Sequence, residues 1–304
     1  MCFAIRDIKY VLGKNEIIIR EKFPEFVPVI IKTGIEKVFE TNGSALDLGV
    51  EALDELLGAS SLLKSSIGCL IYVTQSQTDF LPSGACVLQD RCGLPNSIMA
   101  FDMSQGCSGF VQALSIAANL LNTFENIVIV CADTYRSKLD VADRATSPLF
   151  SDGASATWIS RDGDLRVVGE SHTTDGSGRD FLYHRIPTTE TKEFLHMSGA
   201  DVLLFSKRVV SSEIVKVLEK CSLDISEIDN WYFHQASKVV LDGLEQRFKT
   251  PKPFARNLQD IGNTVSSSIP ILLHTRLAEV NSSRSLLCGF GVGLSTATMV
   301  LEKS

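Results

Sequence analysis

Apolar residues are distributed along the chain in two patterns that alternate with each other. Continuous apolar runs at 67–73 and 127–132 predict buried strands, because a strand that is covered on both faces has no polar side. Helical spacing of the apolar residues predicts amphipathic helices over 44–57 and 110–121. Strands that alternate with helices indicate an α/β fold with mostly parallel strands, in which helices cover the sheets.

The order of these elements occurs a second time, about 160 residues further along the chain. We therefore predict a duplicated α/β unit, whose halves span 1–160 and 161–304. Polar stretches with glycine and proline at 134–150 and 172–200 fit neither half, and we expect them to form loops at a substrate entrance. The other expected elements are strands at 3–8, 96–103, 155–160, 228–233, 286–289 and 296–301 and helices at 82–92, 206–220, 239–248 and 271–279.

Cys107 lies at a predicted strand-to-helix turn, between Gly106 and Gly109. Glycine lets the backbone bend tightly there and leaves room for a ligand to approach. The first turn of a helix offers unpaired N–H groups and a partial positive charge, which favour a thiolate and can lower a cysteine pKa. This pattern predicts a nucleophilic cysteine, although a buried structural cysteine fits this stretch equally well.

Polar residues follow several predicted strands, and in open α/β sheets ligands bind beyond the carboxyl ends of the strands. Cys107, His234, Asn263 and the glycine loop at 289–293 all lie at such ends, so we expect both halves to contribute to one central site. Taken alone, His234 is typical of a histidine at the rim of a core, and Asn263 of a helix N-cap. The glycine loop precedes a strand and not a helix, which excludes a dinucleotide-binding motif.

The composition mainly excludes certain classes of protein and of binding partner. The 304 residues are 44% hydrophobic with a formal net charge of −7, which argues against disorder and against nucleic acid as the main partner. Eight cysteines without a CxxC pair are typical of reduced thiols in the cytoplasm. With no signal pattern, no apolar run of membrane-spanning length and no metal-ligand spacing, we expect a cytoplasmic protein without membrane or metal.

Three motifs, taken in their order, now resemble those of one known family. Gly106-Cys107-Ser108-Gly109-Phe110, His234-Gln235-Ala236-Ser237 and Gly262-Asn263-Thr264 resemble the motifs of thiolase-like condensing enzymes, specifically the β-ketoacyl-acyl-carrier-protein synthase III branch. The terminal loop Cys288-Gly289-Phe290-Gly291-Val292-Gly293-Leu294 also falls in the order of that family. The resemblance covers nearly the whole chain and implies a thiolase-like duplicated α/β fold, layered α-β-α-β-α.

The same resemblance implies a two-step acyltransferase. Cys107 would accept an acyl group as a thioester. His234 and Asn263 would then stabilise the enolate that forms when a malonyl thioester loses carbon dioxide. Backbone N–H groups would hold the acyl oxygen, and no cofactor would be bound permanently, because acyl-coenzyme A and acyl-carrier-protein thioesters act as substrates. The implied oxyanion-hole residues are Cys107, Gly291, Val292 and Gly293.

Resemblance also implies partners, namely an acyl carrier protein and a second copy of the chain in a homodimer. Leu81 would close the acyl pocket of the partner. An acidic carrier protein needs a basic surface, for which the candidates are Arg247, Lys249, Lys252 and Arg256. Ser237, Glu36 and Pro28 depart from the family pattern, which leaves open whether coenzyme A or the carrier protein delivers the acyl group.

Two alternative functions fit the sequence less well. A non-decarboxylating acyltransferase would move the acyl group from Cys107 to an alcohol or an amine, and it differs from the condensing enzyme in releasing no carbon dioxide. A catalytically silent subunit would have little reason to keep Cys107, His234 and Asn263 together.

Overall fold

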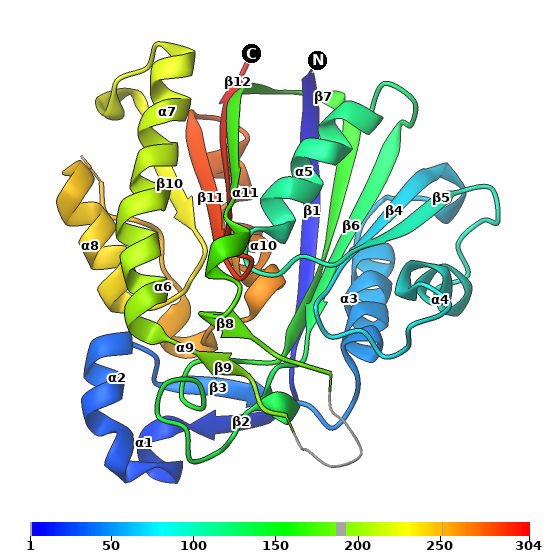
Figure 1. Cartoon of the computed structure of the whole chain (residues 1–304). Coiled ribbons are helices and arrows are strands. Elements are labelled where there is room, and N and C mark those ends of the chain that lie inside the picture. The colour runs from blue at the N-terminus through cyan, green and yellow to red at the C-terminus, as the bar shows by residue number, and fades with distance from the viewer. Residues whose placement is uncertain (1, 187–192, 251) are drawn as a thin grey trace.

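The computed structural model describes residues 2–186, 193–250 and 252–304, and its centre is one eight-stranded mixed sheet (Figure 1). The strands lie in the order β10-β11-β12-β7-β6-β4-β5, with β1 paired to β7. The parallel pairs are β4 with β5, β4 with β6, and β10 with β11. The strands are β1 (Cys2–Leu12), β4 (Ile67–Val73), β5 (Met99–Met103), β6 (Asn126–Asp133), β7 (Gly153–Thr174), β10 (Asn230–Phe233), β11 (Ser285–Gly291) and β12 (Ser295–Lys303).

Strand β7 joins the two parts of this sheet. Up to Ser160 it pairs antiparallel with β6, and from Leu165 to Thr174 it pairs antiparallel with β12. The predicted strand at 155–160 is therefore only its first part. The expectation of mostly parallel strands was wrong for β1, β7 and β12, which pair antiparallel. The predicted division at residue 160 falls where β7 changes its partner, and the duplication itself stays a prediction.

Helices pack in three layers around the two parts of the sheet (Figure 1). Helices α3 and α4 cover one outer face, α7 covers the other, and α5 and α10 lie between the two parts of the sheet. This is the predicted α-β-α-β-α layering. The main helices are α3 (Ala45–Ala59), α4 (Gly84–Arg91), α5 (Gly109–Leu120), α7 (Ser211–Cys221), α8 (Lys238–Phe248) and α10 (Ser268–His274).

Three clusters of buried apolar residues hold these layers together. One fills the space between α3, α4 and the outer face of β4 and β6. A second surrounds α5 and α10, and includes Phe110, Leu114 and Leu272. The third packs α7 and α8 against β10 and β11, and it also contains Cys107. Helix α5 buries Phe110, Val111, Ala113, Leu114 and Ala117 between the two parts of the sheet, which is why these positions are apolar.

Short elements near the entrance were not predicted. A hairpin of β2 (Asn15–Ile18) and β3 (Lys37–Glu40) encloses α1 (Ile19–Lys22) and α2 (Val27–Thr33). The region 134–150 lacks long elements, as expected, whereas 172–200 contains the end of β7, the strands β8 (Leu182–Tyr183) and β9 (His196–Met197), and the start of α6 (Gly199–Phe205). Its residues 187–192 lie outside the described part of the chain.

Two predicted helices differ from the structure in their extent. The helix expected at 206–220 belongs to a longer helical stretch, in which a π-helix (Ser206–Val210) joins α6 to α7. The helix expected at 271–279 is divided into α10 and α11 (Leu277–Val280). The division lies at Thr275 and Arg276. The Arg276 guanidinium donates to the Leu272 carbonyl at 3.1 Å and satisfies part of the end of α10. A further short helix, α9 (Leu258–Ile261), precedes Asn263.

Candidate active site

The carboxyl ends of the parallel strands bring the predicted site residues together. Cys107 follows β5, His234 follows β10, and Gly291 ends β11. Together with Asn263, these residues line one cavity of about 250 Å³, here named the Cys107 pocket. Most of its remaining wall is apolar, with Leu149, Phe150, Met197, Val202, Leu203, Val240 and Phe290 among its residues. A sulfur, an imidazole and a carboxamide therefore face the same apolar space.

The glycine loop approaches Cys107 so closely that a side chain cannot be present there. A Cβ atom at Gly291 would lie 3.0 Å from Cys107 Sγ, and one at Gly289 would lie 2.6 Å from the Cys107 carbonyl oxygen. Cys107 itself directly precedes α5, in a turn closed by the Gly109 N–H, which donates to the Gly106 carbonyl at 2.8 Å. The sequence places glycine where backbone must contact the candidate nucleophile.

Burial raises the pKa of the Cys107 thiol, and the nearby Asp133 carboxylate raises it further. Hydrogen bonds from the backbone N–H groups of Cys107 and Val292 act in the opposite direction, but they are outweighed. The expected lowering of this pKa by the helix N-terminus was therefore wrong, because loss of hydration exceeds the effect of the backbone dipoles.

His234 is 2% exposed and is held by three neighbours. Its backbone N–H donates to the Cys288 carbonyl at 2.9 Å, and its ring packs edge-on against Phe290. Its Nδ1 lies 2.7 Å from Ser268 Oγ, which also accepts the Gln235 N–H at 3.3 Å. Burial lowers the pKa of His234 to about 3, so the imidazole is neutral near pH 7.

Asn263 is fixed by both its backbone and its side chain. Its N–H donates to the Leu149 carbonyl at 2.9 Å, and its carbonyl accepts the Ser151 N–H at the same distance. Its Oδ1 accepts the Val265 N–H at 2.9 Å, which leaves the Nδ2 amide for the pocket. Val265 has a φ of 54°, a conformation that a β-branched residue rarely adopts and that costs about 1–3 kcal/mol. Strain beside Asn263 indicates a position that is built for function and not for stability.

Known proteins with similar sequences identify the family. Family models for 3-oxoacyl-[acyl-carrier-protein] synthase III and for its C-terminal region match residues 101–176 and 218–303. The β-ketoacyl-[acyl-carrier-protein] synthase III of Clostridium perfringens (strain ATCC 13124) is 32% identical over 288 residues, with 89% of each chain covered. The chain belongs to the β-ketoacyl-acyl-carrier-protein synthase III family. It is a condensing enzyme of this family, an acyltransferase with the thiolase-like fold.

Solved structures of this synthase family share the whole fold. A 3-oxoacyl-(acyl-carrier-protein) synthase III solved at 2.1 Å superposes with a TM-score of 0.91 at 30% identity, covering 99% of this chain and 100% of that one. The 3-oxoacyl-(acyl-carrier protein) synthase of Burkholderia xenovorans LB400 gives 0.90 at 27% identity, covering 100% and 95%. The first family model spans Cys107, and the second spans His234, Asn263 and the glycine loop.

Two cations of the Cys107 pocket were missed by the sequence reasoning. Lys32, near the end of α2, and Arg144, in the 134–150 loop, both line it. The guanidinium carbon of Arg144 lies 5.9 Å from the centre of the Phe26 ring. Two signals could have found them: Lys32 directly precedes Thr33-Gly34-Ile35, a further triplet that resembles the family pattern, and Arg144 lies in a loop that was predicted to form an entrance.

A second cavity was also missed, which is lined by Val292 and Gly293 of the glycine loop, whereas Gly291 of the same loop lines the Cys107 pocket. It measures about 350 Å³, is lined by Gln75, Tyr135, Lys138, Leu182 and Val292 among others, and is here named the Gln75 pocket. Leu182 lines both cavities. The residues at its base follow the carboxyl ends of β4 and β6, so the topology that places Cys107 also places them.

Asp133 connects these regions below the site. This fully buried residue ends β6, and its carboxylate accepts the Gln75 N–H at 2.8 Å and the Ser266 N–H at 3.2 Å, together with the hydroxyls of Ser76 and Ser266. Burial raises its pKa, while these donors lower it. The hydrogen bonds tie the β4 end of the first half to the segment that follows Asn263.

The predicted partner-contacting residues lie at the surface. Arg247, Lys249 and Lys252 are exposed around the end of α8, whereas Arg256 forms ion pairs with Asp242 and Glu245. These four residues do not line the Cys107 pocket in the described part of the chain. Leu81 is 86% exposed, between β4 and α4. Its role and the docking role of the cations stay predictions.

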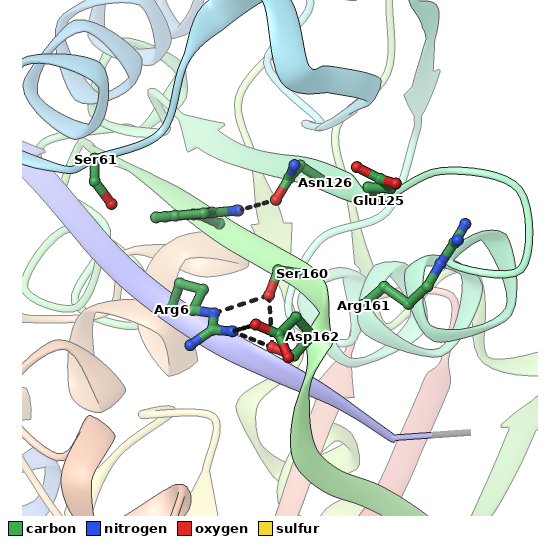
Figure 2. A pocket seen from close by; sticks show the side chains of 8 residues that line it. Arg6, Ser61, Glu125, Asn126, Ser160, Arg161 and Asp162 are labelled. Atoms are coloured by element: carbon green, nitrogen blue, oxygen red, sulfur yellow. Dashed lines mark hydrogen bonds and ion pairs between the residues drawn. The ribbon is translucent and has the colours of Figure 1, made fainter.

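A wide surface hollow of about 790 Å³ lies away from this site, beside the amino-terminal end of β6 (Figure 2). Figure 2 shows the Arg6 guanidinium facing Ser160 and Asp162, with Nε donating to Ser160 Oγ at 2.8 Å. Arg161 points away from them, and its Nε donates to the Leu121 carbonyl at 2.6 Å. Because protein groups already satisfy these cations, the hollow shows no candidate chemistry.

Within the described residues there is no group of three or more His, Cys, Asp or Glu residues that could hold a metal ion. The same residues include no helix of the length and apolar character that crossing a membrane requires. All eight cysteines are free thiols, of which only Cys107 lines the pocket of the candidate site.

Proposed function

We propose that Cys107, His234 and Asn263 carry out a decarboxylative Claisen condensation between an acyl group and a malonyl thioester. The observation that carries this proposal is that all three side chains line one apolar pocket, contributed by the ends of β5 and β10 and by the segment after α9. A dry pocket strengthens fixed hydrogen bonds to a developing negative charge.

In the first step, Cys107 Sγ forms a bond to the carbonyl carbon of an acyl thioester. The donor C–S bond breaks, and the proton of Cys107 leaves with the departing thiol. Charge develops on the carbonyl oxygen during this attack, and the N–H groups of Cys107 and Val292 are placed to stabilise it. Gly291 lets the turn approach Cys107 closely, and Gly293 has a φ of 140°, which side-chain-bearing residues rarely adopt.

In the second step, the malonyl thioester loses carbon dioxide and its electron pair stays on the remaining carbon as an enolate. Asn263 Nδ2 and His234 Nε2 would donate to the enolate oxygen. Ser268 supports this role, because its hydroxyl can donate to Nδ1 of the neutral ring and so leave the ring proton on Nε2. The enolate carbon then bonds to the acyl carbon, and the C–Sγ bond breaks with its electron pair staying on sulfur. The resulting Cys107 thiolate takes a proton from water to regenerate the thiol.

The two substrates would approach from different sides of Cys107. Lys32 and Arg144 line the Cys107 pocket, where they suit the phosphate groups of an arm that carries the malonyl thioester. The acyl chain on Cys107 would extend into the Gln75 pocket, beyond Val292. The family uses acyl-coenzyme A and acyl-carrier-protein thioesters, and no permanently bound cofactor is needed for either step.

We further propose that the enzyme is a homodimer that docks an acyl carrier protein. Strand β5 is an edge strand of the sheet, and large apolar side chains are exposed near it: Phe80 (83%), Leu81 (86%) and Met99 (47%). A second copy would cover them and bring Leu81 to the neighbouring acyl pocket. Arg247, Lys249 and Lys252 remain the proposed docking cations, while Arg256 is neutralised by its ion pairs.

Intact-mass measurement and a carbon dioxide assay together test this function. Incubation with an acyl thioester should add one acyl group to Cys107, and malonyl thioester should then remove it with release of carbon dioxide. Acyl transfer from Cys107 to an alcohol or amine without carbon dioxide would instead support the non-decarboxylating alternative. No acylation by any member of a donor panel would contradict both.

A further inference from the structure

Three side chains make the Gln75 pocket polar directly beside the candidate nucleophile. Tyr135 is 6% exposed, and its hydroxyl donates to Gln75 Oε1 at 2.9 Å. Lys138 Nζ donates to the Gln75 carbonyl at 3.2 Å and to Ser76 Oγ at 2.8 Å. Gln75 follows β4, Tyr135 follows β6, and Lys138 ends the short 3-10 helix (Arg136–Lys138) that comes next.

These residues are close to the place where an acyl chain must begin. The Gln75 side chain lies beside Gly106, the residue before Cys107: a Cβ atom at Gly106 would clash with the Gln75 amide and would lie 3.1 Å from a methyl carbon of Val292. The ring of Tyr135 packs against Phe150 of the Cys107 pocket, with 5.1 Å between ring centres. Burial raises the pKa of Tyr135, and the nearby Cys107 raises it further. An acyl group on Cys107 that turned toward Tyr135 would therefore come close to Gln75, its hydrogen-bond partner.

The pocket offers donors that the protein itself leaves unused. Gln75 Oε1 is taken by Tyr135, and among the described residues its Nε2 amide has no hydrogen-bond partner. Lys138 uses two of its three protons on the protein. An alkyl chain would bury these donors without partners, whereas an oxygen on the chain would accept from them.

We propose that the Gln75 pocket selects short acyl groups that carry a hydroxyl or carbonyl oxygen over the corresponding alkyl groups. This inference rests on the proposed function, because it assigns the acyl chain to the Gln75 pocket. Tyr135 has a positioning role, since its hydrogen bond holds the Gln75 amide with Nε2 available. A site that hydrogen-bonds a substrate oxygen discriminates strongly against an analogue that lacks it.

Competition between acyl-pantetheine thioesters tests the inference, since such donors avoid any dependence on coenzyme A or carrier recognition. The full-length protein receives equal amounts of butyryl and 3-hydroxybutyryl thioester, and in parallel butyryl and 3-oxobutyryl thioester. Intact-mass measurement then separates the adducts. We expect at least a tenfold excess of one oxygenated adduct over butyryl. Equal amounts or a butyryl excess, on an enzyme that does become acylated, would overturn the inference and leave the proposed function standing.

Substitutions test which residues cause the preference for oxygenated acyl groups. Gln75→Met keeps the volume and removes the amide, and it should reduce the preference to less than about twofold. Gln246→Met, an exposed position on α8, is the matched control and should keep the full preference. Tyr135→Phe should reduce the preference at least threefold without loss of total acylation, and it serves as the second test if Gln75→Met does not fold. An unchanged preference in Tyr135→Phe and in any folded Gln75→Met would overturn the inference.

Discussion

The two cavities near Cys107 differ in chemistry and are formed by different strand ends, those of β5, β10 and β11 for the Cys107 pocket and those of β4 and β6 for the Gln75 pocket. In the Cys107 pocket, Ser268 Oγ holds His234 Nδ1, and the Val265 N–H holds Asn263 Oδ1. Most of the remaining wall of this pocket is apolar. In the Gln75 pocket, the polar groups bond to one another and still leave donors free. The first arrangement suits charge that develops during a reaction, and the second suits recognition of a substrate that stays unchanged there.

Removal of the nucleophile should have the largest effect, because both cavities serve it. Cys107→Ala should abolish the acyl adduct in intact-mass spectra and lower condensation by more than a thousandfold. Cys86→Ala is the matched control, since Cys86 is exposed, and it should leave both quantities unchanged. A persistent adduct in Cys107→Ala would show that another thiol carries the acyl group.

The comparison of the two cavities predicts that His234 and Asn263 act only in the second step, the condensation. His234→Ala and Asn263→Ala should each lower the rate of condensation about 100- to 1,000-fold, as expected for one donor to a developing charge. Acylation of Cys107 should change by less than about tenfold in the same variants. Stopped-flow or quenched single-turnover assays separate the two steps. A matching loss in acylation would mean that the pocket serves both steps.

Burial leaves a plain signal in β4 and β6, which allowed these strands to be predicted from the sequence. Strand β5 was expected to be buried from residue 96, but it begins at Met99 and is an edge strand of exposed and half-buried residues. Strand β4 has the predicted bounds, Ile67–Val73, since nearly all its side chains are buried. The second part of β7 was missed because it is half-exposed and polar, and pairs with a strand far along the chain.

The residues of the candidate site also fall into two groups, those that the sequence predicts and those that only the fold brings together. Cys107, His234 and Asn263 stand in motifs, and glycine marks the close approach at Gly291. Gln75 and Tyr135 carry no such mark, because a polar residue after a strand is common in any α/β protein. Their meeting depends on the neighbouring positions of β4 and β6, which only the fold reveals. The rise in the pKa of Cys107 likewise results from burial, which no sequence motif indicates.

Charge at the Cys107 pocket should matter only for donors with phosphate groups. A double variant, Lys32→Glu with Arg144→Glu, should raise KM for a malonyl donor that carries phosphates about tenfold. KM for the phosphate-free pantetheine analogue should stay within about twofold, since the apolar wall and His234 are unaffected. Equal increases for both donors would indicate a damaged pocket and not a lost charge contact.

The exposed cations at the end of α8 should have a smaller and purely macromolecular effect. Arg247 lies about 12 Å along the helix from Val239, which lines the Cys107 pocket, so these residues can meet a carrier but not its arm. Arg247→Glu with Lys249→Glu should raise the carrier KM about threefold and flatten its dependence on salt. Arg256→Gln would confuse this test, because it also breaks the ion pairs with Asp242 and Glu245. An unchanged KM and salt dependence would contradict the proposed docking role of these cations.

The smallest predicted effect concerns pH and depends on the burial of His234. Because burial lowers its pKa to about 3, the ring should stay neutral from pH 8 down to pH 5, with its Nε2 proton still available. Enzyme that is already acylated, mixed with malonyl-pantetheine, isolates the second step from titration of the Cys107 thiol. Its single-turnover rate should change by less than about twofold over this range. A histidine with an ordinary pKa near 6.5 would instead change its charge within the range. A tenfold fall per pH unit below that value would therefore show that the imidazole is more hydrated than its pocket implies, and the contrast between the two cavities would lose its basis.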